Sequence, residues 1–214
     1  RAVLFADEAG KPNDDRYRED VYGFSWTEGL RGLGWARDAV PTLKAGSTIG
    51  IPSPPAIWNP SGPVDRRIVT PQIEEAEQLQ GFPRQWTEPA NEISNSKGTR
   101  WKLVGNAVTA GVSRWVGERL MQPGVPLLEG RPLERGNRWP TAAYGAKGKA
   151  WAVDLSLWPR HETYQHLSDL VDLHEAPRLS ARASAGFHSR TQRASLRFVE
   201  AFISDIAEHA ALMA

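Results

Sequence analysis

Apolar residues recur at helical spacing in two stretches of the chain. Residues 190–213 carry apolar side chains at intervals of three and four, which predicts a terminal amphipathic helix. The same spacing over residues 108–120 predicts a second helix with Asn106 as its N-cap. A shorter helix is expected between Thr70, a capping residue followed by proline, and Gly81, a residue type that ends helices.

Other apolar blocks are too short for helices and are predicted to form strands. Residues 2–6 are an apolar run closed by turn residues, which is typical of a buried strand. Residues 21–60 are rich in glycine and proline and favour loops with a few short strands, and residues 151–155 are weakly strand-like. A small core is expected from Trp26, Leu33, Trp35, Val40 and Leu43.

Composition narrows the function classes only slightly. The 214 residues are 40% hydrophobic and 24% charged, as in an ordinary folded domain. The net charge is +1, so any contact with DNA has to come from local basic patches. There is no cysteine, which excludes disulfides and thiolate sites, and no apolar run approaches the roughly 18 residues of a membrane span.

Three motifs lie between residues 67 and 120. They are Arg-Ile-Val-Thr-Pro at 67–71, Leu-Gln-Gly-Phe-Pro at 79–83 and Lys-Gly-Thr-Arg-Trp-Lys-Leu-Val-Gly-Asn-Ala-Val at 97–108. In this order they resemble the ninth and tenth sequence blocks of the DNA (cytosine-5)-methyltransferases. The family usually has Glu three residues after the capping Thr; Ile73 stands there, so no capping box is expected.

The resemblance implies an α/β fragment: a loop-rich target-recognition region with short strands, plus the closing helices of a Rossmann-like, S-adenosylmethionine-dependent methyltransferase domain. The implied parts are the end of a catalytic-domain strand (1–7), the target-recognition region (8–66), the carboxyl-terminal blocks (67–121) and an extension with a terminal helix (122–214). A bacterial cytoplasmic, nucleoid-associated protein of a restriction-modification system is expected.

The resemblance also implies binding residues. Gly105, Asn106 and Ala107 would bind S-adenosyl-L-methionine through backbone N–H groups and the Asn106 amide at a helix amino terminus; a simple N-cap is the alternative for Asn106. Arg1 would lie near the flipped base. Candidates for contact with double-stranded DNA are Arg31, Arg37, Thr42, Leu43, Lys44, Ser47 and Thr48.

The family's chemistry needs groups that this chain does not carry. A Cys thiolate attacks cytosine C6 and activates C5, a Glu binds the ring nitrogen, and a Gly-rich loop holds the cofactor. Without a cysteine, the chain alone is predicted to be inactive. We therefore expect a partner: an amino-terminal catalytic portion, either in the same polypeptide or as a separate subunit.

Two other interpretations of the chain remain open at this level. The chain could be a non-catalytic DNA-binding or regulatory module, or an unrelated α/β domain. One helix face is predicted to carry Arg190, Arg193 and Arg197, with Arg182 just upstream. This face is either exposed to solvent or in contact with DNA phosphates. The five histidines show no metal-site spacing.

Overall fold

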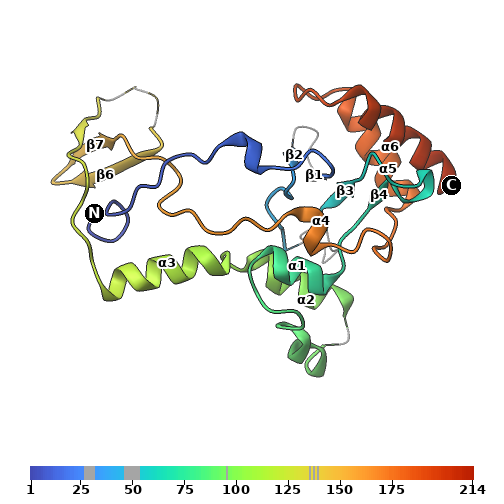
Figure 1. The fold of residues 1–214 in the computed structure, drawn as a ribbon, viewed down its shortest axis with the longest axis horizontal. Helices are drawn as coiled ribbons and strands as arrows, with labels where there is room; N and C mark the ends of the chain where they lie inside the picture. Colours follow the sequence, from blue (N-terminus) through green and yellow to red (C-terminus); the bar gives the residue numbers. More distant parts are fainter. Residues whose placement is uncertain (27–31, 46–53, 95, 135, 137, 139) are drawn as a thin grey trace. The chain divides into compact units, whose positions relative to one another are not determined.

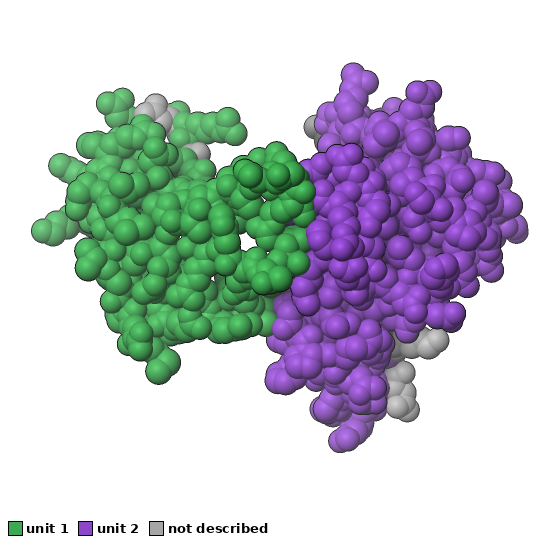
Figure 2. Space-filling model, in the orientation of Figure 1, with its two compact units in different colours: residues 1–16, 109–164 green, residues 17–108, 165–214 purple. Residues whose placement is uncertain are grey.

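The computed structural model describes residues 1–26, 32–45, 54–94, 96–134, 136, 138 and 140–214. The chain divides into two compact units, coloured separately in Figure 2. Unit 1 consists of residues 1–16 and 109–164, and unit 2 of residues 17–108 and 165–214. Each unit is therefore built from segments far apart in the sequence.

Unit 2 is organised around an antiparallel sheet (Figure 1). Its strands are β1 (Tyr22–Trp26), β2 (Leu33–Arg37), β3 (Ala56–Trp58) and β4 (Ile68–Val69), in the order β2-β1-β3-β4. Phe24 on β1 lies opposite Trp35 on β2 and Ala56 on β3. The short strands expected between residues 21 and 60 are thus confirmed.

Both faces of this sheet are apolar and covered. Phe24, Ala56 and Trp58 share one face with side chains of α5 (Ala181–Thr191) and α6 (Glu200–Leu212). Val21, Ile57 and Val69 lie on the other face and pack with the segment that contains α4 (Leu167–Leu170). The alternation of strand side chains thus makes the sheet a middle layer.

The remaining helices of unit 2 are α1 (Ile73–Leu79), α2 (Lys97–Asn106) and the short 3₁₀ helices η2 (Val64–Arg66) and η3 (Glu88–Glu92). Leu43, Ala76 and Val104 form a third buried cluster that joins α1, α2 and the chain after β2.

Unit 1 contains η1 (Asp14–Arg16), the helix α3 (Ala110–Met121) and a second antiparallel sheet. The strands of this sheet are β5 (Arg131–Pro132), β6 (Ala142–Ala146) and β7 (Lys149–Val153), in the order β5-β7-β6. β7 confirms the strand signal at residues 151–155. Lys147 and Gly148 both have positive φ, at 52° and 73°, and form the turn between β6 and β7.

The predicted helix between Thr70 and Gly81 is present but begins later. α1 starts at Ile73, and its capping interaction is one the sequence pattern missed: the Gln72 N–H donates to Glu75 Oε2 at 2.7 Å. Gly81 has a φ of 83°, the left-handed conformation that terminates helices.

The predicted strand over residues 2–6 is wrong. This segment is a turn in which the Phe5 N–H donates to the Arg1 carbonyl oxygen at 2.9 Å, and Leu4 is half exposed. A strand needs a neighbour for its backbone groups, and no described strand of unit 1 pairs with this segment.

The predicted terminal helix over residues 190–213 is wrong in its first half. α5 ends and α6 begins within this range, so Arg190, Arg193 and Arg197 do not share a helix face. Phe198 lies in the turn between the two helices and packs against aromatic rings of the sheet and of α5. Burial of this ring favours a turn over a continuous helix.

The small core predicted near residues 26–43 is divided in the structure. Trp26, Leu33 and Trp35 pack on the α5–α6 side of the sheet, whereas Val40 and Leu43 pack against α1 and α2. The mixed α/β class is confirmed; the Rossmann-like domain remains a prediction. No helix within the described ranges is both long and apolar enough to span a membrane.

Candidate functional site

Gly105, Asn106 and Ala107 lie at the carboxyl end of α2, not at a helix amino terminus. Asn106 is the last residue of α2, and the next helix, α3, begins at Ala110 with Thr109 as its N-cap. The predicted N-cap role of Asn106 is therefore wrong, because residues 97–104 are themselves helical and the backbone becomes extended at Ala107. Asn106 is exposed at this helix end.

Side chains and backbone of unit 2 satisfy the carboxyl end of α2. Gln80, which follows α1, donates from Nε2 to the Val104 carbonyl at 3.0 Å and the Ala107 carbonyl at 3.4 Å. The Ala107 N–H donates to the Leu103 and Val104 carbonyls. The Ala107 amide is thus occupied, so it does not fit the predicted role of binding a cofactor carboxylate. The exposed Asn106 amide does fit hydrogen bonding to a polar ligand.

Gly105 brings two sequence motifs into contact. A Cβ atom at this position would lie 2.1 Å from the Lys44 carbonyl carbon and 2.2 Å from the Ala45 nitrogen. Only glycine allows the backbone of residues 41–45 to approach α2 so closely. Leu43 anchors the same segment in the cluster with Val104. The segment with the candidate DNA contacts Thr42 and Leu43 therefore neighbours the predicted cofactor segment that contains Gly105.

A buried ion pair fixes α2 against α1. The side chain of Glu77 is fully buried and accepts hydrogen bonds from the Thr87 N–H (2.8 Å), the Thr87 hydroxyl (2.5 Å) and Arg100 Nη2 (3.0 Å). Arg100 also pairs with Glu74 at 2.8 Å. Burial on its own raises the pKa of Glu77, but the hydrogen bonds from Thr87 and Arg100 outweigh it and hold the pKa below its usual value.

Sequence reasoning missed this network. Glu74 and Glu77 are three residues apart, so they share one side of α1. That spacing in the sequence indicates two carboxylates on one side of a helix, but no pattern near them identifies Arg100 as their partner. The network matters for the site because it positions α2, whose end carries Asn106.

The candidate DNA contacts differ in their exposure and in their partners. Thr42 is exposed, Leu43 is buried and Lys44 is partly buried. Arg37 pairs with Glu19 at 2.6 Å, and its guanidinium lies 5.8 Å from the ring centre of Tyr17. The remaining candidates, Arg31, Ser47 and Thr48, lie outside the described residues.

Arg1 belongs to unit 1, where it contacts protein groups. Its Nη2 donates to the Leu128 carbonyl at 3.1 Å, and its guanidinium lies 4.5 Å from the ring centre of Tyr144. Its proposed place near a flipped base remains a prediction. Among the residues that the structure describes, no cluster of His, Asp or Glu could hold a metal ion.

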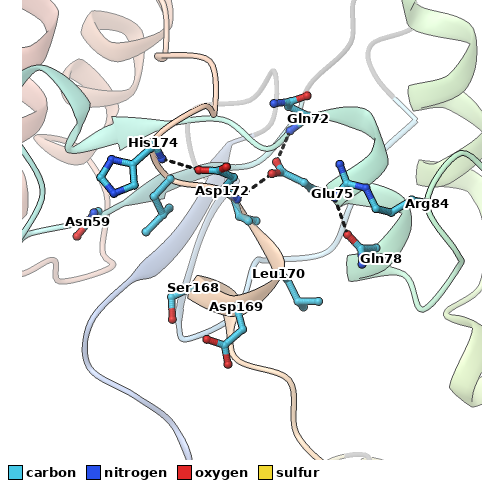
Figure 3. A pocket seen from close by; sticks show the side chains of 12 residues that line it. Asn59, Gln72, Glu75, Gln78, Arg84, Ser168, Asp169, Leu170, Asp172 and His174 are labelled. Atoms are coloured by element: carbon cyan, nitrogen blue, oxygen red, sulfur yellow. Dashed lines mark hydrogen bonds between the residues drawn. The ribbon is translucent and has the colours of Figure 1, made fainter.

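Unit 2 also contains a cavity of about 670 Å³ beside α1 (Figure 3). Glu75 lies in its wall and accepts hydrogen bonds from the Gln72 N–H (2.7 Å) and the Asp172 N–H (2.8 Å). Asp172 in turn accepts from the His174 N–H at 3.0 Å. These carboxylates bind backbone groups, so they hold the wall together and supply no obvious ligand site.

Comparison with known proteins gives one informative match. No protein-family model matches the chain, and no solved structure matches it. The chain is 40% identical over 214 residues to the type II methyltransferase M2.BsuMI of Bacillus subtilis (strain 168). The match covers 95% of this chain and 54% of the relative, so the chain spans about half the relative's length. The chain is thus similar to about half of a type II methyltransferase.

Proposed function

We propose that this chain is the carboxyl-terminal portion of a DNA (cytosine-5)-methyltransferase, which methylates double-stranded DNA with S-adenosyl-L-methionine as cofactor. The observation that carries the proposal is the backbone contact of Gly105 with Lys44 and Ala45. In this proposal, the segment with the candidate DNA contacts Thr42 and Leu43 neighbours the segment proposed to bind the cofactor. The similarity to a type II methyltransferase supports the same conclusion.

In this proposal, unit 2 brings together DNA and cofactor contacts. Thr42 and Lys44 lie on the segment held by Leu43, whose backbone contacts Gly105, the residue before the exposed Asn106. Asn106 would bind a polar group of S-adenosyl-L-methionine, and Gly105 acts as a positioning residue. When bound, the cofactor supplies the methyl group that is transferred to cytosine C5. Base contacts then come from the loops of residues 22–57.

The exposed apolar side chains of α3 in unit 1 support the proposed amino-terminal portion. α3 has no buried residue, and it exposes Val112, Leu120 and Met121 by 51%, 63% and 85%. Apolar groups gathered on one element are typical of a surface that another polypeptide segment covers. Because the chain has no cysteine, the same amino-terminal portion must supply the thiolate that attacks cytosine C6.

A reconstitution experiment tests the proposal. The chain is mixed with, or joined to, a methyltransferase amino-terminal portion that carries the Pro-Cys and Glu-Asn-Val motifs, and is incubated with DNA and labelled methyl donor. Digestion of the DNA to nucleosides should yield 5-methylcytosine for the combination and none for the chain alone. Methyl transfer to an exocyclic nitrogen, or no transfer over many DNA sequences, would overturn the proposal. DNA binding without transfer would favour the non-catalytic module.

The role of Asn106 has its own test in the joined enzyme. Asn106→Ala should raise the Kd for S-adenosyl-L-methionine about tenfold, because it removes one or two hydrogen bonds to a polar group. Asn91→Ala, at an exposed position on η3, is the matched control and should leave the Kd unchanged. Equal Kd values for both variants would show that Asn106 serves only as a helix end.

A further inference from the structure

Residues 176–199 form the most one-sided charged stretch of the chain. This stretch contains five arginines, one histidine and no carboxylate: Arg178, Arg182, His188, Arg190, Arg193 and Arg197. It contrasts with the nearly neutral chain as a whole, whose net charge is +1. The positive charge is therefore concentrated on α5 and on the turn that follows it.

Three of these arginines are exposed and are not used inside the protein. Arg182, Arg193 and Arg197 are exposed and make no ion pair with any described residue, and we call them the basic surface. Some arginines elsewhere do form ion pairs, as Arg67 does with Asp205 at 2.7 Å. Arg190 differs from the basic surface, because it donates to the Gly186 carbonyl at 2.8 Å within α5.

Aromatic contacts place α5 and the turn that follows it against the β1–β2 hairpin. Phe187 of α5 contacts Trp26 with ring centres 5.6 Å apart, and Phe198 of the following turn contacts Trp35 at 5.4 Å. Trp26 pairs with Leu33 at the end of the β1–β2 ladder. In Figure 1, α5 and α6 lie beside this sheet.

We propose that the basic surface binds the phosphate backbone of double-stranded DNA that flanks the recognised site. The carboxyl-terminal segment 165–214 then completes the target-recognition fold and also adds affinity for DNA. Guanidinium groups suit this role because they form bidentate, charge-assisted hydrogen bonds with phosphate. The eleven residues of α5 span about 16 Å, over which duplex DNA carries about nine charges. The proposal rests on the proposed function only in that DNA is the partner.

Salt-dependent DNA binding by the full chain tests this surface. In the triple variant Arg182→Gln, Arg193→Gln and Arg197→Gln, the slope of log Kd against log salt should fall by up to about 2.7, since each phosphate contact contributes about 0.9. Affinity for duplex DNA should fall about tenfold at 0.15 M salt, while circular dichroism stays unchanged. Glutamine removes the charge but is polar and has a similar helix propensity.

A matched control removes the same charge from unit 1. The control is the triple variant Arg131→Gln, Lys147→Gln and Lys149→Gln, whose positions are exposed on or between the strands of the second sheet. This variant should keep the slope of log Kd against log salt. An unchanged slope in the arginine variant, an equal fall in both variants, or no DNA binding by the chain would overturn the inference. The two proposals can fail separately. If reconstitution yields no methyl transfer, but the arginine variant loses affinity for DNA and the control variant does not, the proposed function is wrong and the DNA-binding surface is supported.

Discussion

The two units of this chain bury apolar side chains to very different extents. In unit 2, Phe24, Phe187 and Phe202 are fully buried between the sheet and the helices α5 and α6. In the described part of unit 1, the buried apolar side chains of the second sheet and its continuation are Ala152, Val153 and Leu155. Unit 2 thus has an apolar core of its own, whereas α3 of unit 1 is held mainly by polar contacts, such as those of Trp115 and Arg119 with Asp7.

This difference shows where a covering partner is needed. α3 has apolar residues at helical spacing, yet within unit 1 they remain partly or largely exposed, as at Val112 and Leu120. An amphipathic helix is stable in water mainly when its apolar face is packed. The sequence pattern of α3 therefore indicates a surface to be buried, and in our account the amino-terminal catalytic portion buries it.

The largest effect is expected from truncation in the core of unit 2. Phe202→Ala should lower the free energy of unfolding of unit 2 by about 4 kcal/mol, because it leaves a cavity among aromatic rings. Leu120→Ala on α3 should cost less than about 0.5 kcal/mol. Urea unfolding, followed by hydrogen exchange of peptides from each unit, measures both values. Equal losses of unfolding free energy in the two variants would contradict the difference between the units.

A smaller loss is expected from the buried ion pair. Glu77→Gln should cost about 3 kcal/mol, since it leaves Arg100 and Thr87 without their charged acceptor in a buried position. Glu88→Gln, on the exposed helix η3, is the control and should be nearly neutral. The midpoint of urea unfolding is the measurement; a neutral Glu77→Gln would show that the network does not hold α2.

Gly105→Ala should cause the next largest loss of stability. The added methyl group overlaps the Lys44–Ala45 backbone, and overpacking of this kind costs roughly 1–3 kcal/mol. In the joined enzyme the same change should weaken both DNA and cofactor binding. Gly117→Ala on α3 has open space around the new methyl group and is the control. Unchanged binding of both ligands by Gly105→Ala would show that the close approach has no role in the site.

The smallest effect concerns acid sensitivity of unit 1. The hydrogen bond from Arg119 lowers the pKa of Asp7, with a smaller contribution from Trp115 and in spite of burial. A lowered pKa in the folded state stabilises unit 1 above the unfolded value of 3.8, and this contribution is lost as the pH falls through the folded value. Asp7→Asn should therefore flatten the loss of stability below about pH 4. An unaltered acid profile would contradict this.

Local signals predicted much of the fold. Gly81 identified the end of α1, and the region rich in glycine and proline at residues 21–60 was correctly expected to hold short strands. α2 could not be predicted in this way, because Val104 is its only buried residue among those described and one such position shows no helical period. The boundary between α2 and α3 was misplaced for the same reason, and with it the predicted cap at Asn106.

The candidate site was predicted in its parts but not in its assembly. The sequence motifs identified both Leu43 and Gly105, and only the structure shows that their segments touch. Arg100 and Glu77 are 23 residues apart, and their pairing depends on the packing of two helices. Long-range pairing of this kind has no local pattern that a single sequence displays.

Hydrogen exchange of α3 tests the central claim most directly. The amides of α3 and of α6 are compared in the isolated chain and after the chain is joined to an amino-terminal catalytic portion. We expect α6 to be protected in both states, and α3 to exchange rapidly alone and to gain protection on joining. Protection of α3 equal to that of α6 in the isolated chain, or none gained on joining, would contradict the account.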